Sequence, residues 1–397
     1  MVNFRKYSYW FLPFLYALVA LFATNRNYFL PSSHIEFVSC EVTQYNNFII
    51  FKNSFYHLIH GIDLYQSFPN EQYDLFKYTP TFSLFFGIIA LLPNYLGLLI
   101  WNLLNILIPL YAIHKIFGLN QRLKSIFTIF LLPEFFTTIL NSQSNGLILG
   151  LLLLAFSAVQ KNETRNAVIF ILSTAFIKLF GIFFFVIFLI YPNQIKKAAS
   201  NGIIFGVLFL ILPLMFVDFA YLKELYLSYF NLLKNDGNQF VKYSVMGWLN
   251  QWFHFYPSKN IILILGFLVQ LLPVLLIRKW TEMSKILFGM SVLIWMVIFN
   301  HMAESATFII AVGAIYVAFA TYEKLPNGIL FLIIFMLFTT ELGPSDLYPK
   351  MWRIWIVEKA QLKVFPCILI WMVLIFETIR LNLRGNTSTL ILKKGRN

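Results

Sequence analysis

The first candidate for chemistry is Lys178, which lies in the apolar stretch STAFIKLFGIFFF. An ionisable side chain inside such a segment is costly to bury, so it is a functional-site hypothesis by default. A buried ammonium group needs an anionic partner, and a lipid phosphate would serve. The alternative is a structural lysine that extends to the membrane surface or pairs with a carboxylate of the fold.

Other polar side chains occur at the ends of apolar runs. Gln143 and Asn145 belong to NSQSNG, and His301 and Glu304 belong to FNHMAES. His301 could donate a hydrogen bond to a phosphate or a sugar hydroxyl. Amides and carboxylates at this depth usually have a partner on another helix, so a structural role is about as well supported for these residues. Only their convergence with Lys178 favours binding.

A dense group of polar and aromatic residues follows the first apolar segment, between Gln44 and Trp101. Its carboxylates include Asp63, Glu71 and Asp74, with Lys77 and Tyr78 directly after them. Carboxylates beside tyrosines, which have apolar faces and polar tips, would suit a sugar or another polyol. A solvated loop with interfacial aromatic residues explains the same residue types.

The composition defines the elements that must position these side chains. The chain has 397 residues, of which 59% are hydrophobic and 12% are charged, and its mean hydropathy is +0.73. Soluble domains carry roughly twice that charged fraction. Apolar runs of about 20 residues recur from end to end, which predicts an all-α polytopic membrane protein of about 10–12 spans.

The net charge of +13 is explained by the same architecture. Lys and Arg collect on the cytoplasmic loops of membrane proteins, and here they form short clusters between apolar segments. We therefore expect no nucleic-acid partner. The two cysteines, Cys40 and Cys367, carry no metal-binding spacing, and no glycine-rich nucleotide loop is present.

We expect one integral membrane domain over residues 1–397. A first span ends near Ala23, and an outer loop over residues 24–80 contains an amphipathic helix at the membrane interface. Residues 218–258 and 341–362 form further outer loops, and residues 380–397 form a basic cytoplasmic tail. Two apolar segments, Phe82–Ile113 and Ala167–Ile190, do not fit one span each, so each should be broken, the second near Lys178.

The motifs together resemble glycosyltransferase family 87. The family has an Asp-Phe-x-x-Tyr helix, a Gly-x-x-Leu-Tyr turn, Tyr-Pro-Pro, a Leu-Pro break and a Trp-x-x-x-Asn helix. The chain reads NNFIIFKNSFYHLIHGIDLY and then FKYTPTFSLFFGIIALLPNYLGLLIWNLLN. Later, SQSNGLILGLLLLA, AFIKLFGIFFFVIFLI and IFNHMAESATF are similar to the family's Gly-Gln-x-Asn, Lys-Leu-x-Pro and late histidine segments. The resemblance covers most of the chain in the family's order.

This resemblance implies a GT-C-type membrane glycosyltransferase with a polyprenyl-phosphate sugar donor. Its best-understood relatives are actinobacterial mannosyltransferases, so the sugar is expected to be a hexose, with mannose as a candidate. Residue by residue, the resemblance places Lys178 at the donor phosphate. The other cavity residues that it implies are Tyr78, Gln143, Asn145 and His301.

The chain departs from the family at its catalytic position. Counting back from Gly61 and Tyr65, the family's Asp falls on Asn47. An amide cannot accept a proton from an acceptor hydroxyl, so it cannot be the general base. Tyr-Pro-Pro is also shifted, to Tyr78-Thr79-Pro80. We therefore look for the base among the nearby carboxylates, in the order Asp74, Asp63 and Glu71, with Glu304 from the opposite wall.

The resulting hypothesis is a hexosyltransferase that moves a sugar from a lipid carrier to a glycolipid or glycan on the outer side of the membrane, in a bacterial inner membrane. A divalent metal ion is left open as a cofactor. The alternative is a transporter, a flippase or a catalytically inactive binding protein for a lipid-linked sugar. Asn47 is the residue that keeps this alternative open.

Overall fold

The computed structural model describes residues 4–36, 38–236, 241 and 243–383. Throughout this part the chain is helical, with no strand beyond an isolated bridge between Ser33 and Val42. The prediction of an all-α architecture is therefore confirmed. Residues 384–397 of the predicted cytoplasmic tail, and residues 237–240 and 242 of a predicted outer loop, lie outside the described residues.

The N-terminal half contains α-helices of 9 to 26 residues and, after α8, three 3₁₀ helices. In chain order the described elements are α1 (Phe4–Phe29), α2 (Asn46–Ile59), α3 (Pro80–Ala90), α4 (Asn94–Lys115), α5 (Gln121–Phe130), α6 (Leu132–Leu140), α7 (Asn145–Gln160), α8 (Thr164–Ile177), η1 (Leu179–Ile190), η2 (Pro192–Gln194), α9 (Ile195–Ile211) and η3 (Leu212–Met215).

The C-terminal half adds further α-helices, one 3₁₀ helix (η4) and two π-helices (η5 and η6). Its helices are α10 (Phe219–Asp236), α11 (Val245–Phe253), α12 (Lys259–Leu276), α13 (Glu282–Ile298), η4 (Ser305–Thr307), α14 (Phe308–Phe319), α15 (Asn327–Met336), η5 (Leu337–Glu341), α16 (Lys350–Ile354), η6 (Trp355–Lys359) and α17 (Phe365–Leu383).

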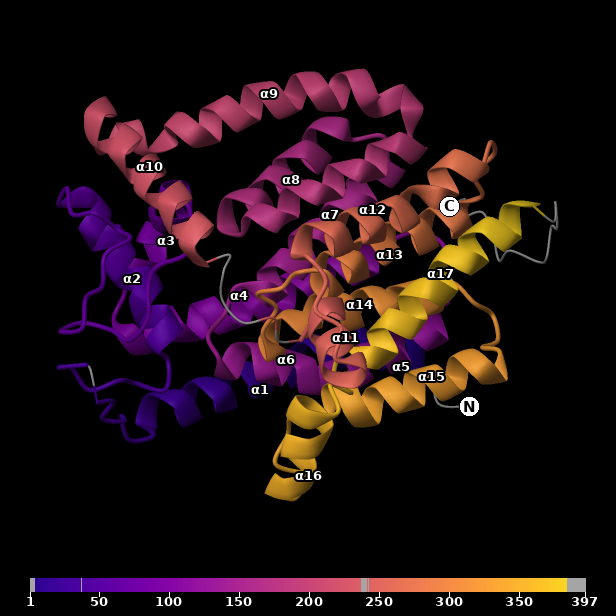
Figure 1. Cartoon of the computed structure of the whole chain (residues 1–397), viewed down its shortest axis with the longest axis horizontal. Coiled ribbons are helices and arrows are strands. Elements are labelled where there is room, and N and C mark those ends of the chain that lie inside the picture. Colours follow the sequence, from indigo (N-terminus) through magenta and orange to yellow (C-terminus); the bar gives the residue numbers. More distant parts are fainter. Residues whose placement is uncertain (1–3, 37, 237–240, 242, 384–397) are drawn as a thin grey trace.

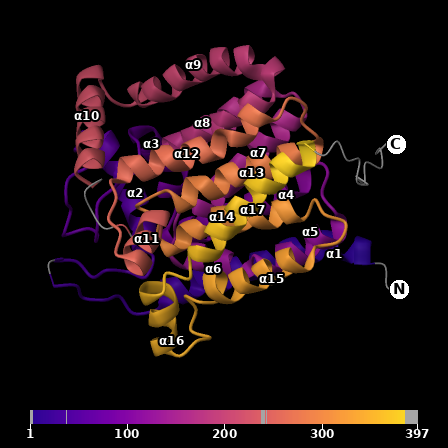
Figure 2. The same ribbon diagram turned by 45° about the vertical axis from the view of Figure 1, so that its right-hand side comes forward.

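A bundle of long helices forms the body of the molecule (Figure 1). At its centre α14 is buried along its whole length, and α13 is buried along nearly all of it. A helix that is apolar all round belongs in such a core. Around it pack α4 with α7, α7 with α8, and α13 with α17. The turned view in Figure 2 shows α9 at the rim, where its apolar side chains are largely exposed.

Five helices are long and apolar enough to cross a membrane, judged by length and composition within the described part of the chain. They are Asn94–Lys115, Gln121–Leu140, Pro192–Met215, Lys259–Leu276 and Phe365–Asn382. Six shorter apolar helices accompany them. The expected total of about 10–12 spans stays a prediction, because a shorter helix can also contribute to a crossing.

An aromatic cluster joins α2, α3 and α4 at one end of the bundle. The Phe51 ring of α2 lies 4.8 Å from Tyr78, 5.2 Å from Phe82 and 5.8 Å from Trp101, measured between centroids, mostly edge to face. Such pairs contribute about 0.5–1.5 kcal/mol each beyond the area that they bury. The apolar face of α2 is therefore buried within the protein (Phe48, Phe51 and Leu58 are each 0% exposed), rather than turned to lipid as the sequence suggested.

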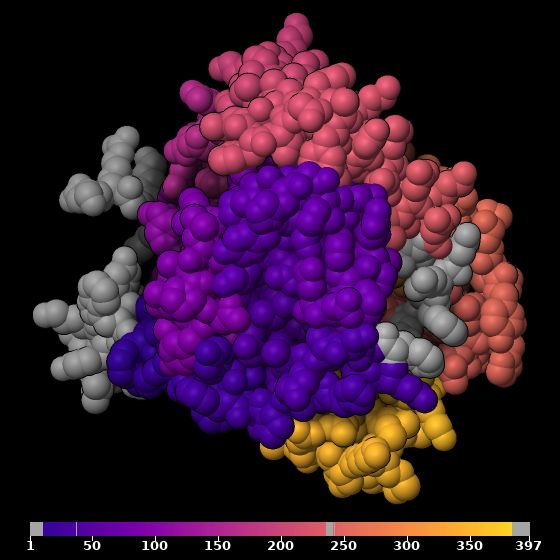
Figure 3. Space-filling model, turned by 90° about the vertical axis from the view of Figure 1, so that its left-hand side faces the viewer, coloured from indigo at the N-terminus to yellow at the C-terminus, as the bar shows by residue number. Residues whose placement is uncertain are grey.

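This end of the molecule faces the viewer in Figure 3. The indigo and violet surface of the N-terminal segment, which includes α2 and α3, covers its centre. The salmon surface of the α9–α11 region lies above and to the right, and the α16 region lies below. Figure 1 shows that α1 begins and α17 ends toward the opposite side of the molecule.

Both apolar segments that were expected to break do so. The first divides into α3 and α4 at the Leu-Pro sequence before Asn94, and the second divides into α8 and η1 at Lys178. The 12-residue η1 is a 3₁₀ helix, which spans about 24 Å where an α-helix of equal length would span about 18 Å. A short segment can therefore return a long way through the bundle from Lys178.

Candidate active site

Lys178 lies at the centre of a polar cluster. Its ammonium Nζ donates to the side-chain oxygens of Gln143, at 3.1 Å, and Asn145, at 3.0 Å. It also lies 5.7 Å from the ring centroid of Tyr78, at which distance a cation is attracted by the face of the ring. Lys178 makes no ion pair with a described carboxylate. The cation is thus held by neutral groups, which leaves its charge available to an anion.

The helix break itself positions Lys178. Its backbone is extended (φ −131°, ψ 123°), which ends α8 and turns the chain into η1. Thr79 stabilises this end of α8, because its hydroxyl donates to the carbonyl of Phe176 while also capping the start of α3. Gly181 lets η1 approach α8 closely, since a Cβ there would come within 2.4 Å of Thr174 Oγ1. The sequence Tyr78-Thr79-Pro80 therefore sets both the ring beside Lys178 and the helix end that carries it.

The turn between α6 and α7 carries Gln143 and is held by α4. The indole Nε1 of Trp101 donates to the carbonyl of Ser142 at 2.9 Å, and the backbone N–H of Leu147 donates to Asn105 Oδ1 at 2.9 Å. Gly146 permits this contact, because a Cβ there would lie 2.1 Å from the Asn105 carbonyl oxygen. The Trp-x-x-x-Asn helix noticed in the sequence thus supports the residues beside Lys178.

Glu304 lies on the far side of Gln143. The Gln143 Nε2 donates to Glu304 Oε2 at 2.6 Å, so one amide connects the carboxylate with Lys178. Glu304 caps η4, because its side chain accepts from the Thr307 N–H and its own N–H donates to the Thr307 hydroxyl. The Glu304 side chain is nevertheless exposed. His301 is half-buried in the turn that precedes it.

Tyr78 connects the Lys178 cluster with the loop that carries Asp74. Burial raises the pKa of the Tyr78 hydroxyl well above its usual range, a contact with the Ser144 hydroxyl opposes the rise, and the charges of Glu304 and Asp74 add to it. Both carboxylates are therefore close enough to Tyr78 to affect its ionisation. The tyrosine stays neutral and can only donate or accept hydrogen bonds.

Asp74 is held in an unusual backbone conformation. Its φ is +75°, which is uncommon for a residue with a side chain and persists when the surroundings enforce it. Asn46 of α2 enforces it here, because its side chain accepts from the Tyr73 N–H at 3.0 Å and donates to the Tyr73 carbonyl at 2.6 Å. The Asp74 carboxylate accepts from the Leu75 N–H and lies 3.6 Å from Lys77 Nζ.

The other two loop carboxylates have separate structural partners. Asp63 accepts from the Tyr65 N–H at 3.1 Å and from Ser228 of α10 at 3.0 Å. Glu71 lies 2.9 Å from His57 Nε2. The structure therefore brings Lys178, Gln143, Asn145, Tyr78 and Glu304 together. Asp74 with Lys77 lies on the adjoining loop, whereas Asp63 and Glu71 are engaged elsewhere.

A second charged cluster lies inside the bundle, and the sequence reasoning missed it. Lys363 and Glu134 form an ion pair of 2.9 Å with both side chains fully buried, and Lys363 also donates to the Thr340 carbonyl at 2.8 Å. Tyr316 donates to the neighbouring Glu341. A signal was available, since Glu134 interrupts the apolar run IFLLPEFFTTIL and an ionisable residue there needs a partner.

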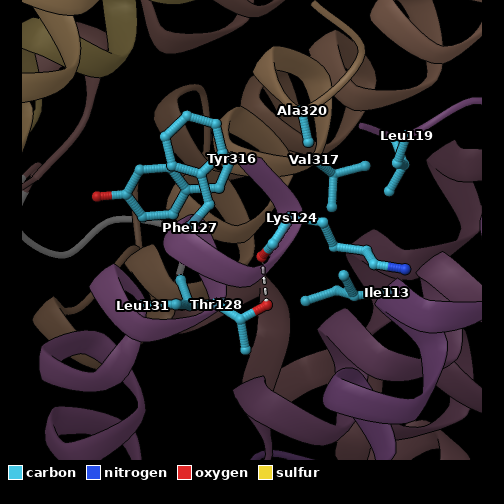
Figure 4. Close-up of a pocket in the computed structure, with 9 residues that line it drawn as sticks. All are labelled: Ile113, Leu119, Lys124, Phe127, Thr128, Leu131, Tyr316, Val317 and Ala320. Carbon is cyan, nitrogen blue, oxygen red and sulfur yellow. Dashed lines mark hydrogen bonds between the residues drawn. The ribbon is translucent and has the colours of Figure 1, made fainter. Parts of the chain in front are cut away.

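Two hollows lie away from Lys178. One has a volume of about 10 Å³, which is room for a single water molecule. Figure 4 shows the Lys124 side chain extending toward Leu119 and Ile113 on one side of this hollow, with Tyr316 on the other side. The second, of about 430 Å³, is an apolar groove between α1 and α6. Neither combines the charge and the size that a sugar phosphate requires. Among the described residues, no group of three or more His, Cys, Asp or Glu side chains could hold a metal ion.

Comparison with known proteins gives one family match. The profile of glycosyltransferase family 87 matches residues 76–340, which include every residue of the Lys178 cluster. No curated protein matches the sequence. Two solved structures of ArnT from Cupriavidus metallidurans, one in the apo state and one bound to undecaprenyl phosphate, are 12% and 11% identical, with TM-scores of 0.40 and 0.41. The similarity covers 92% and 93% of this chain and 77% of each ArnT chain.

Proposed function

The chain belongs to glycosyltransferase family 87, and we propose that it transfers a hexose from a polyprenyl-phosphate carrier to a glycolipid or glycan acceptor. The observation that carries this proposal is Lys178, a half-buried cation held by the Gln143 and Asn145 oxygens and the Tyr78 ring. A phosphate that reaches this ammonium group meets a full positive charge that is partly shielded from water, where electrostatic attraction is stronger than in bulk water.

The reaction forms one glycosidic bond and breaks another. A carboxylate removes the proton of the acceptor hydroxyl, the oxygen attacks the anomeric carbon, and the bond from that carbon to the carrier's phosphate oxygen breaks. Lys178 stabilises the negative charge on the departing polyprenyl phosphate. Electrostatic stabilisation of this kind supplies much of the rate enhancement of many enzymes. Mannose is the first sugar to test, because the mannosyltransferases that the sequence resembles use it.

Asp74 is our first choice for the general base. Its side chain is exposed, and it lies on the loop next to Tyr78. The hydrogen bonds of Asn46 to the Tyr73 backbone fix the conformation of this loop. Glu304 is the second choice, since the amide of Gln143 already holds it and its own helix cap restricts it. Asp63 and Glu71 rank lower because Ser228 and His57 engage them.

The proposed site lies at the outer face of a bacterial inner membrane. Basic residues are expected on cytoplasmic connections, and the sequence assigns the loop with Asp74 and the turn with Gln143 to the opposite side. The acceptor would enter beneath the loop over residues 44–80, and the prenyl chain would lie among the apolar helices. A divalent metal ion is a candidate cofactor, to be tested by adding a chelator to the transfer assay.

The test is sugar transfer by the purified full chain in lipid nanodiscs, supplied with polyprenyl-phosphomannose and polyprenyl-phosphoglucose. Lys178→Ala should weaken carrier binding about 10- to 100-fold, the range for losing hydrogen bonds to a charged group. Lys223→Ala, which changes an exposed lysine of α10, is the matched control. Full activity in Lys178→Ala would exclude the phosphate role. Carrier binding without transfer by the native chain would favour a transporter or an inactive binding protein.

A further inference from the structure

Three consecutive backbone carbonyls, those of the last residue of α6 and of the first two residues of the turn that follows it, each accept a hydrogen bond from a different helix. The Leu140 carbonyl accepts from Asn27 of α1 at 2.7 Å, the Asn141 carbonyl from Asn47 of α2 at 2.8 Å, and the Ser142 carbonyl from Trp101 of α4 at 2.9 Å. A turn that is held from three directions has little freedom to shift.

The turn needs this support because its conformation is unfavourable. Ser142 has a φ of +49°, in the left-handed region that residues with a side chain rarely adopt. Such a conformation persists only when neighbouring contacts enforce it. The next residue is Gln143, whose oxygen accepts from Lys178 and whose nitrogen donates to Glu304. The position of this turn therefore decides whether Gln143 can contact both groups.

Asn47 contributes to the turn through its N–H group. A carbonyl oxygen can only accept, so the group opposite must donate, and the amide of asparagine offers two such hydrogens. An ionised aspartate offers none, and its oxygen would be repelled by the Asn141 carbonyl at the 2.8 Å separation seen here. The neighbouring Asn46 holds the Tyr73–Asp74 loop in a similar way. The start of α2 thus connects the two segments that carry the proposed base and the proposed phosphate site.

We propose that Asn47 is a positioning residue that holds the Gln143 turn against Lys178, and that it does not mark a lost catalytic base. The inference rests on the proposed sugar transfer at Lys178. Asn47 precedes the residues matched by the family profile, 76–340, so its role is argued from its own contacts. An asparagine here is then required for activity, and the aspartate that the family motif would place here is harmful.

The experiment compares Asn47→Asp and Asn47→Ala with the native chain in the transfer assay. Alanine removes the donor and should raise the KM for the lipid donor about 5-fold. Aspartate adds repulsion and should raise the KM further than alanine does, with a smaller effect on kcat, because the Asn141 carbonyl then loses its donor and faces a negative charge. A restored base predicts the reverse order, with Asn47→Asp raising kcat and rescuing Asp74→Asn. That outcome would overturn the proposal.

The pH profile separates the two roles further. Protonation of the carboxylate that Asn47→Asp introduces restores an O–H that can donate to the Asn141 carbonyl, so this variant should recover relative to the native chain as the pH falls. The charged groups on the segments that this part of the structure joins are Asp74 and Lys77 on the loop that Asn46 holds, Lys52 on α2, and Lys178 and Glu304 beyond the turn. The native chain carries all of these, so the ratio of variant to native activity isolates residue 47. A ratio that instead rises with pH would indicate a catalytic carboxylate.

Hydrogen exchange tests the positioning role without any turnover. The amides of residues 141–145 should exchange faster in Asn47→Asp than in the native chain, while those of α9 remain unchanged. Unchanged exchange in the turn would refute the inference even if the enzyme proves active. Faster exchange in a chain that transfers no sugar would support the positioning role and reject only the proposed function.

Discussion

Gly146→Ala adds only one methyl group, yet it should reduce sugar transfer strongly. Gly146 is the second residue of α7, and it contacts the backbone of α4 at Asn105. An added Cβ would lie 2.1 Å from the Asn105 carbonyl oxygen, whereas ordinary contact begins at 3.4 Å. The two helices must therefore separate locally by about 1.3 Å, the difference between these two distances, and the obstacle is backbone rather than a flexible side chain.

The displacement acts on stability and on the site together. Adding a methyl group to a close-packed contact typically costs about 1–3 kcal/mol. Asn145 precedes Gly146 directly and accepts from Lys178 at 3.0 Å, so a shift of about 1.3 Å is enough to break this hydrogen bond. Misplacement of a binding group by about 1 Å can lower a rate about 10²-fold. We expect a fall in transfer of about that size, accompanied by a lower thermal midpoint.

The assay measures carrier binding, sugar transfer and thermal unfolding on the same preparation. Gly206→Ala is the control, because a Cβ at this position on α9 meets nothing within 4 Å. It should leave transfer unchanged and stabilise the helix slightly, since alanine is the better helix former. Native transfer and stability in Gly146→Ala would show that α4 and α7 do not approach closely here, and would refute the account of how Asn145 is positioned.

Three further changes test separate parts of the structure. Asp74→Asn should lower sugar transfer about 10²- to 10⁴-fold while carrier binding is retained. The control, Glu224→Gln on the exposed side of α10, should leave transfer unchanged. Equal activity of the two variants would exclude Asp74 as the base. Lys363→Met should destabilise the chain by about 3–5 kcal/mol, because Glu134 is left buried and unpaired. Thermal unfolding of the double variant with Glu134→Met should show that much of this stability is recovered. A double variant as unstable as the single one would contradict the ion-pair argument. Trp101→Phe removes the hydrogen bond to the Ser142 carbonyl and should lower the free energy of unfolding by about 1 kcal/mol. It should also speed hydrogen exchange of the amides in the turn. Unaltered exchange in the turn would mean that this contact is dispensable.

Several features of the site could be predicted because they depend on neighbouring residues in the chain. Apolar runs of membrane length, a proline after a leucine, and a lysine inside an apolar segment are local patterns. They predicted the all-α architecture, the division between α3 and α4, and the break at Lys178. The motif order also indicated the family, which the profile match to residues 76–340 confirms.

The partner of each charged group could not be predicted in the same way. The sequence ranked four carboxylates as the base, with Asp74 first, but it showed the partner of none of them. The contacts of Asp63 with Ser228 and of Glu71 with His57 emerge only when distant segments pack. The buried pair of Lys363 and Glu134 joins residues 229 positions apart, and the sequence reasoning overlooked it.

The sequence by itself determined which segments are apolar, where they break and which residue types stand at the breaks, because hydrophobicity and backbone preference act over a few neighbouring residues. Only the tertiary structure decided that Asn47 faces a carbonyl oxygen, that Gln143 joins Lys178 to Glu304, and that Gly146 lies against α4. These contacts depend on how helices from different parts of the chain approach one another, and a single substitution in any of them changes the site without changing the local pattern.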